Sequence, residues 1–176
     1  MVQIYRILGN RKPMVIIECL LNSKDEISQT EIIKKTKIAK ATAVKWLSVL
    51  AENKIASIRK IGTTNLYAIN LNNIIVRELK KIYTLSLLSS IEKNLEEEAY
   101  LYGSAARGED TPDSDIDLLL IGNKKRESKI ESIERISKKI KRRINFAIFT
   151  NMEWLEIGKR DKPFFERVEK DKIRLL

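Results

Sequence analysis

The sequence predicts a two-part α/β (α+β) protein: a helical unit that ends in a β-hairpin, followed by a small domain of alternating strands and helices. Three observations support this fold class. The 176 residues provide enough chain for two small hydrophobic cores. Three helical patterns and a hairpin pattern occupy the first half, and strand and helix patterns alternate in the second. The composition, 43% hydrophobic and 33% charged, is typical of a folded soluble protein.

The first two helices are predicted from the residues at their ends. Pro13 marks the start of a helix over Pro13–Leu21, because a proline at a helix start loses no backbone hydrogen bond. Ser28 is expected to cap a second helix over Gln29–Thr36, with Glu31 as its capping-box partner.

A third helix is expected over Lys40–Asn53, after a tight turn. Its predicted inward stripe is Val44, Leu47 and Leu50. The side chains expected to point outward are Lys40, Thr42 and Lys45. Trp46 could contact a nucleic-acid base or pack in the core, and we favour the core.

A basic hairpin follows this helix, with strands over Ile55–Ile61 and Leu66–Ile69 and with Arg59 and Lys60 near its tip. The order helix, helix, turn, helix and basic hairpin over residues 1–71 resembles a winged helix-turn-helix DNA-binding domain. The resemblance implies that the third helix enters the major groove and that the hairpin, or wing, contacts the DNA backbone. The DNA-binding residues that it implies are Lys40, Thr42, Lys45, Arg59 and Lys60. A protein-interaction module of the same fold is the alternative.

Charge is unevenly distributed along the chain, whose formal net charge is +10. Residues 1–75 carry twelve lysines and arginines against five acidic residues, whereas residues 107–117 carry one arginine against five carboxylates. The basic half and the acidic segment are therefore expected to serve different functions.

Residues 72–96 are expected to form a connecting helix, helical from Asn72 to about Asn94. Its predicted apolar stripe consists of Ile75, Leu79, Ile82, Leu88, Ile91 and Leu95. This stripe either packs against the domain that follows or pairs with its own copy in a homodimer.

The most informative segment is Leu101–Gly122, which combines a strand, a glycine turn and clustered carboxylates. The strand Ala99–Tyr102 runs into Gly103 and Ser104, and a helix opens there. Such a turn offers free backbone N–H groups to a phosphate, and Gly103 permits close approach.

Two carboxylates follow at the start of a second predicted strand, which is completed by residues 118–121. Asp115 and Asp117 point to the same face of this strand, because side chains alternate along it. Two carboxylates so close repel one another unless a cation lies between them. Oxygen ligands favour Mg²⁺ or Mn²⁺ over zinc.

The remaining elements complete the second domain, residues 97–176. An amphipathic helix is expected over Ser128–Arg143, followed by a strand over Ile144–Phe149 that is buried on both faces. The inward side chains predicted for the helix are Ile130, Ile133, Ile136 and Ile140, whereas Lys129, Lys138, Lys139, Arg142 and Arg143 point elsewhere. A helical segment then follows, anchored by Trp154, Phe164 and Phe165, with a short last strand over Ile173–Leu176.

The string GS, then RG, then SDxDLLL resembles the signature of the DNA polymerase beta-like nucleotidyltransferases, especially the minimal nucleotidyltransferases of archaea and bacteria. The resemblance implies a small mixed sheet, Mg²⁺ and a nucleoside triphosphate (NTP) as substrate or ligand. The nucleotide-binding residues that it implies are Gly103, Ser104, Arg107 and Ser114. Asp115 and Asp117 would be the metal-binding and catalytic carboxylates. Arg107 is expected to fix the loop by pairing with a carboxylate rather than to contact the substrate.

One position departs from this family pattern. The family carries a third carboxylate on the following strand, and Asn145 stands there in this sequence. Asparagine lacks the charge and cannot take a proton from an acceptor hydroxyl. The second metal of a two-metal site would therefore be weakened. Glu109, Asp110 and Asp113 lie near in sequence, but the pattern does not place them at the site.

Two functions are compatible with these observations. One is an enzyme that transfers a nucleoside monophosphate from an NTP to a hydroxyl of a nucleic acid, a protein or a small molecule. Among relatives such acceptors include a tyrosine of a HEPN-type partner protein. The other is a DNA-binding transcriptional regulator whose nucleotidyltransferase domain binds nucleotide but turns over weakly because of Asn145.

Several classes of protein are disfavoured by composition. The chain has no histidine and a single cysteine, Cys19, so imidazole metal ligands and internal disulfides are excluded. No apolar run reaches membrane-spanning length, and the N-terminus lacks a signal-peptide layout, so a cytoplasmic protein is expected.

Overall fold

The computed structural model describes residues 7–89, 98–122 and 126–175. The chain divides into two compact units, Met1–Glu78 and Leu79–Leu176, and the division falls within helix α5 (Ile74–Leu88). Each unit is described by itself. No helix within the described ranges is long and apolar enough to cross a membrane.

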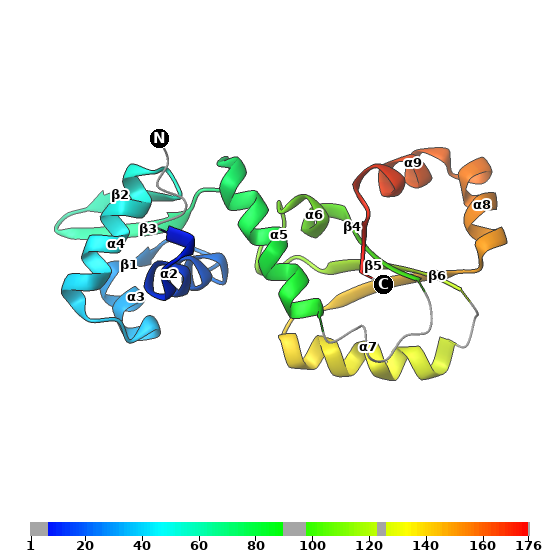
Figure 1. Cartoon of the computed structure of the whole chain (residues 1–176), viewed down its shortest axis with the longest axis horizontal. Helices are drawn as coiled ribbons and strands as arrows, with labels where there is room; N and C mark the ends of the chain where they lie inside the picture. The colour runs from blue at the N-terminus through cyan, green and yellow to red at the C-terminus, as the bar shows by residue number, and fades with distance from the viewer. Residues whose placement is uncertain (1–6, 90–97, 123–125, 176) are drawn as a thin grey trace. The chain divides into compact units, whose positions relative to one another are not determined.

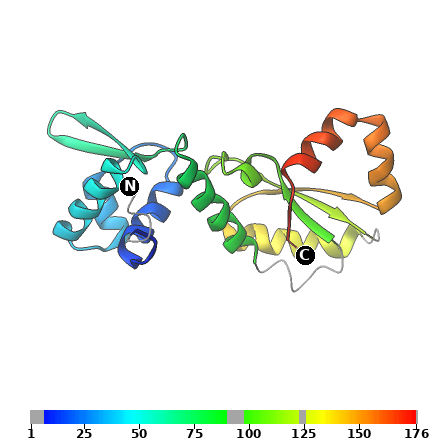
Figure 2. The ribbon, with the colours of Figure 1, turned by 45° about the horizontal axis from the view of Figure 1, so that its top comes forward.

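Among the residues that the structure describes, the first unit contains helices α2, α3 and α4 and a small antiparallel sheet (Figure 1). Its elements are α2 (Arg11–Leu21), β1 (Ile27–Ser28), α3 (Gln29–Thr36), α4 (Lys40–Glu52), β2 (Ala56–Ile61) and β3 (Thr64–Ile69). The strands lie in the order β1-β3-β2, and both pairings are antiparallel. The β2–β3 hairpin extends beyond the helices of this unit (Figure 2).

Capping side chains fix the helix starts in this unit. Ser28 Oγ accepts a hydrogen bond from the Glu31 amide at 3.2 Å, and the Glu31 carboxylate accepts one from the Ser28 amide at 3.0 Å. The predicted capping box is therefore confirmed. Helix α2 starts two residues before Pro13, because the Asn10 side chain accepts a hydrogen bond from the Lys12 amide.

The buried face of α4 differs from the prediction. Its buried residues are Ala43, Trp46, Leu47 and Leu50. Val44, predicted to point inward, is 40% exposed. A stripe at i, i+3, i+4 and i+7 stays on one side of a helix, whereas a strict three-residue repeat drifts around it. Trp46 is 6% exposed, so the prediction that it belongs to the core is confirmed.

The stripe predicted for helix α5 is confirmed in part. Leu79 and Leu88 are buried as predicted, whereas Ile82 is 62% exposed. Lys80, Thr84 and Leu88 are four residues apart, so they lie along one side of the helix, and all three are buried. Because Lys80 and Thr84 are polar, hydrophobic periodicity could not identify them as buried. The predicted stripe residues Ile91 and Leu95 lie outside the described residues.

The second unit is built on a four-stranded mixed sheet, as the sequence predicted (Figure 1). Its remaining elements are β4 (Glu98–Tyr102), α6 (Gly103–Arg107), β5 (Ile116–Ile121), α7 (Arg126–Ile140), β6 (Ile144–Phe149), α8 (Asn151–Arg160), α9 (Lys162–Asp171) and β7 (Ile173–Arg174). The strand order is β6-β5-β4-β7. Strands β5 and β6 are parallel, and β4 pairs antiparallel with both β5 and β7.

Both faces of this sheet are covered by helices. On one face Leu118 and Leu120 pack in a core with Ile133 and Ile136 of α7. On the other face Tyr100, Leu119 and Ile121 pack with Trp154 of α8 and Val168 of α9. The alternation along β5 therefore divides its side chains between two cores.

Three details of this unit correct the sequence prediction. Ile130 is 37% exposed rather than buried, and α7 ends at Ile140 rather than at Arg143. Strand β6 is not buried on both faces: Ile144 is buried, Asn145 is exposed, and the other four residues are half-buried. Among the described strands, β6 is one of the two edge strands of this sheet. Trp154 is an anchor as predicted, with its ring 5.0 Å from that of Phe165.

Candidate active site

The site is organised by the turn between β4 and α6. Tyr102 ends β4 and is paired in register with Asp117 of β5, so the next residue, Gly103, faces the Asp117 carboxylate. Gly103 adopts a φ of +74°, and a Cβ at this position would lie 2.6 Å from Oδ2 of Asp117. Only glycine therefore combines this backbone conformation with this close approach.

A short helix and a loop follow the glycine turn. Arg107, the last residue of α6, donates to Glu109 at 2.7 Å and to Asp171 at the end of α9 at 2.8 Å. These hydrogen bonds raise the pKa of Arg107 above the ordinary value of an arginine. Arg107 therefore ties the loop to α9, and its predicted pairing with a carboxylate is observed.

The two candidate metal ligands have different partners. Asp115 accepts two hydrogen bonds from the Arg143 guanidinium, at 2.8 Å to Oδ1 and 2.6 Å to Oδ2. The hydrogen bonds from Arg143 lower the pKa of Asp115. Asp117 is half-buried, and burial, assisted by the negative charge of Asp115, raises its pKa.

Asn145 lies directly beside Asp117. The two residues are register partners in the parallel pair β5–β6, and Asn145 Nδ2 donates to Asp117 Oδ1 at 3.1 Å. The predicted alignment of the third strand is therefore confirmed geometrically. The amide acts here as a donor to the carboxylate, which is the opposite of what a third metal-binding carboxylate would do.

The donor set fits one divalent cation rather than two. Asp115 and Asp117 supply four carboxylate oxygens on adjoining positions, and oxygen is the ligand that Mg²⁺ and Mn²⁺ prefer. Within the described ranges, no group of three or more acidic, cysteine or histidine side chains is placed to hold a metal. Because Asn145 is neutral, a second metal ion would lack the negative charge of a third carboxylate at this position.

The two serines of the motif have different surroundings. Ser104 is half-buried in α6, and its backbone carbonyl accepts a hydrogen bond from the Glu109 amide at 2.9 Å. Ser114 uses its hydroxyl within the turn, where Oγ lies 2.9 Å from both the amide and the hydroxyl of Thr111. Ser114 therefore shapes the loop that precedes Asp115.

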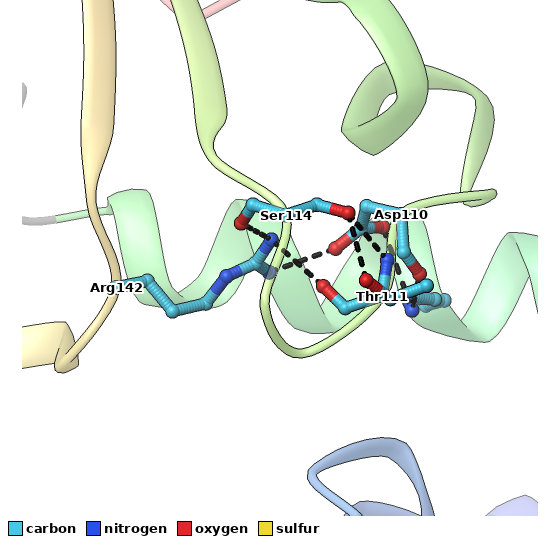
Figure 3. Close-up of polar contacts among 5 residues, drawn as sticks. Asp110, Thr111, Ser114 and Arg142 are labelled. Carbon is cyan, nitrogen blue, oxygen red and sulfur yellow. Dashed lines mark hydrogen bonds and ion pairs between the residues drawn. The ribbon is translucent and has the colours of Figure 1, made fainter. Parts of the chain in front are cut away.

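A buried ionic cluster that the sequence pattern does not indicate lies against this loop (Figure 3). Asp110 is 1% exposed, and its carboxylate lies 2.8 Å from Arg142 Nη1 and 3.6 Å from Lys80 Nζ. Lys80 also donates to the backbone carbonyl of Asp110. Burial lowers the pKa of Lys80. Asp110 therefore has its own cations and is not a substitute for the missing third carboxylate.

Arg142 extends this cluster to the backbone of the loop. Its Nη2 donates to the Ser114 carbonyl at 2.7 Å and to the Thr111 carbonyl at 3.4 Å. Figure 3 shows Arg142 reaching from beside β6 to the segment that carries Asp110, Thr111 and Ser114. A buried arginine with three acceptors on one loop fixes the position of that loop.

The predicted DNA-binding residues lie on α4 and on the β2–β3 hairpin of the first unit. Lys40, Lys45 and Lys60 are exposed, and Thr42 is half-buried. Arg59 donates to the Glu26 carboxylate at 2.7 Å and forms an ion pair with it. The charge of Arg59 is therefore partly compensated, whereas no compensating carboxylate is described for Lys60.

The Gly103 turn faces the Asp117 carboxylate at one end of the mixed sheet. The comparison with protein families identifies the domain that carries this turn. Residues 84–176 match the model of the nucleotidyltransferase domain, and because this is more than half of the 176 residues, the chain belongs to that family.

A solved structure is also similar to this chain. It is that of a "putative nucleotidyltransferase" from Sulfolobus solfataricus, with 25% sequence identity over 56% of this chain and 85% of that one and a TM-score of 0.31. No protein of curated function matches the sequence.

Proposed function

We propose that the protein transfers a nucleoside monophosphate from an NTP to a hydroxyl acceptor in a Mg²⁺-dependent reaction. The observation that supports this most directly is the close approach of the Gly103 turn to the Asp117 carboxylate within a nucleotidyltransferase domain. The acceptor hydroxyl oxygen bonds to the α-phosphorus of the NTP, the bond from that phosphorus to the bridging oxygen breaks, and pyrophosphate leaves.

Each residue has a role that follows from its position. Asp115 and Asp117 would hold Mg²⁺, which supplies positive charge against the triphosphate when bound. The Gly103 backbone and the neighbouring Ser104 hydroxyl would bind phosphate oxygens, since a glycine leaves the backbone accessible. Arg107 and Ser114 support the loop through the contacts described above.

Asn145 should make nucleotidyl transfer slower than it would be in a site with three carboxylates. Its neutral amide cannot accept the proton of the attacking hydroxyl, and its N–H is already directed at Asp117. The proton must therefore pass to water or to a group on the acceptor. We expect slow turnover with a simple hydroxyl acceptor.

The exposed lysines of the first unit support a second function, binding of DNA. Lys40 and Lys45 lie on α4 and Lys60 lies on the hairpin, the two elements that contact DNA in winged helix-turn-helix domains. If DNA binding is the main function, the protein is a transcriptional regulator whose nucleotidyltransferase domain binds nucleotide with little turnover.

One experiment separates these functions. The full chain is titrated with ATP, GTP, CTP and UTP in turn, each with Mg²⁺, and pyrophosphate release is then measured. Binding followed by release supports the enzyme, and binding without release supports the regulator. The double variant Asp115→Asn, Asp117→Asn should remain folded and lose Mg²⁺-dependent nucleotide binding. Unchanged Mg²⁺-dependent NTP affinity in this variant would contradict the assignment of Asp115 and Asp117 as the metal ligands.

A further inference from the structure

Arg143 donates to both oxygens of the Asp115 carboxylate. Its Nε and Nη2 each bind a different oxygen, at 2.8 Å and 2.6 Å. The pair is neutral, so of the two candidate metal ligands it is Asp117 that keeps a negative charge with no arginine or lysine paired to it among the described residues. A divalent cation that arrives by itself therefore meets one net negative charge and must compete with a guanidinium for the other carboxylate.

This ion pair is not needed to hold the loop in place. The Arg143 side chain is 80% exposed, and exposed ion pairs contribute little to folding. The neighbouring Arg142 is only 11% exposed and already fixes the loop through Asp110 and the Ser114 carbonyl. The two adjacent arginines of the α7–β6 connection therefore have different roles. Arg142 holds the loop, whereas Arg143 lies on the solvent-exposed side of the site, where it can contact a ligand.

The backbone keeps Arg143 at the site whatever its side chain contacts. The Arg143 carbonyl accepts a hydrogen bond from the Ile116 amide at 2.9 Å. Ile116 is the residue between Asp115 and Asp117. A guanidinium that leaves Asp115 therefore stays within reach of any ligand bound at the two carboxylates. Its planar fork fits a phosphate as well as it fits a carboxylate.

We propose that Arg143 is the triphosphate-binding cation of this site and that Asp115 holds its side chain until nucleotide and metal arrive together. This inference rests on the proposed function, because it assumes that an NTP is the ligand. On binding, the Arg143 guanidinium would leave Asp115 for the phosphates that accompany the metal, and the Asp115 carboxylate would then hold the metal. The exchange makes binding of metal and nucleotide interdependent.

The test measures the affinity for Mn²⁺ alone and the affinity for an NTP, which should change in opposite directions when Arg143 is replaced. Mn²⁺ alone is titrated into the full-length protein and followed by electron paramagnetic resonance. ATP, GTP, CTP and UTP are then titrated in turn in the presence of saturating Mn²⁺. The variants are Arg143→Ala and Arg143→Lys. The control is Arg160→Ala, because Arg160 is 78% exposed, carries the same charge and pairs with Glu156 on α8.

In Arg143→Ala we expect Mn²⁺ alone to bind about threefold to tenfold more tightly, since an exposed ion pair no longer competes. We expect the NTP to bind about tenfold or more weakly, since a charge-assisted contact is lost. Arg143→Lys should lie between wild type and Arg143→Ala for both ligands, because it keeps the charge and loses the fork. Arg160→Ala should match wild type for both.

Other outcomes overturn the inference in distinguishable ways. If Arg143→Ala binds Mn²⁺ alone no better than wild type, Arg143 does not compete with the metal. If the variant binds the NTP as well as wild type does, Arg143 does not contact the triphosphate. If wild type binds no NTP in the presence of Mn²⁺, the proposed function itself fails, and the role of Arg143 fails with it. Circular dichroism of each variant establishes that it is folded.

Discussion

A Cβ on Gly103 would lie 2.6 Å from Oδ2 of Asp117, which is closer than side-chain carbons approach carboxylate oxygens. The glycine turn and the carboxylate are therefore a single structural feature. Any side chain at residue 103 must move Asp117, and Asp117 is held from its other side by Asn145.

Gly103→Ala should consequently damage the site more than the fold. The φ of +74° costs an alanine about 1–2 kcal/mol of folding free energy, and the contact with Asp117 adds to this cost. We expect Mn²⁺ affinity to fall at least tenfold. Gly62→Ala is the matched control, because Gly62 has a φ of +57° and nothing within 4 Å of its Cβ position. Equal Mn²⁺ affinity in the two variants would show that the Asp117 contact is unimportant.

A second prediction concerns the position that departs from the family pattern. Asn145→Asp should raise nucleotidyl transfer about tenfold or more in the presence of Mg²⁺, which requires about 1.4 kcal/mol of transition-state stabilisation. Without metal, the new carboxylate replaces a hydrogen-bond donor to Asp117 by a like charge, so the variant should unfold at lower urea concentration. Pyrophosphate release and urea unfolding with and without Mg²⁺ measure the two effects.

The controls for Asn145→Asp separate two causes of failure. Asn145→Ala removes the donor without adding charge, so it should lose stability without gaining activity. If Asn145→Asp loses metal-free stability and gains no activity, the assay lacks the right acceptor. If neither property changes, residue 145 does not influence Asp117 in solution.

The extent of sequence-based prediction differs between the two sides of this site. The glycine turn at Gly103 and the carboxylate of Asp117 were each predicted from local patterns. Their contact was not, because it depends on the pairing of Tyr102 with Asp117 between β4 and β5. The place of Asn145 followed from the family resemblance, and the pairing of β5 with β6 puts it beside Asp117.

Arg142, Arg143 and Lys80 were not predictable in the same way. The sequence pattern extended the helix of residues 128–143 through both arginines, whereas α7 ends at Ile140 and Lys141 adopts a φ of +55°. This left-handed residue redirects the chain, so that Arg142 points inward and Arg143 reaches Asp115. The partner of Asp110 on α5 is 30 residues away, and no periodic pattern relates two such positions. Aspartate is also rarely buried, so the residue type gives no indication that Asp110 lies in the core.

The adjacent arginines provide a third prediction. Arg142→Ala should destabilise the protein by about 3 kcal/mol or more, since it removes one cation from a buried carboxylate. Arg143→Ala should cost much less, because its pair with Asp115 is exposed. Urea unfolding of both variants measures the difference. Similar losses from the two substitutions would mean that the buried cluster does not stabilise the loop.

A fourth prediction uses the raised pKa of Asp117. A carboxyl whose pKa is higher in the folded state than in the unfolded state favours folding when it is protonated and loses that contribution as pH rises through its folded pKa. Metal-free Asp117→Asn removes the cost of the buried charge, so it should be more stable than wild type at pH 7. Its advantage should shrink as pH falls toward the ordinary aspartate value of 3.8.

The control for this prediction is Asp115→Asn, because the pKa of Asp115 is lowered by Arg143. Its ionised form favours folding, so that contribution exists at neutral pH and disappears as pH falls through the folded pKa. Asp115→Asn should therefore be less stable than wild type at pH 7 and should approach it in acid. Thermal unfolding between pH 3 and pH 7 measures both profiles, and profiles of the same sign would contradict the assignment.

The last prediction tests DNA binding through the hairpin. If the first unit binds duplex DNA, the logarithm of the affinity should fall linearly with the logarithm of salt concentration. Each lost phosphate contact should reduce the slope by about 0.9. Lys60→Ala should show this full reduction. Arg59→Ala should show less, because Arg59 is already paired with Glu26 and part of its charge is compensated. Fluorescence anisotropy with the full chain and a short duplex measures both slopes. Equal reductions would mean that Arg59 leaves Glu26 to contact DNA, and unchanged slopes in both variants would exclude the hairpin from the interface.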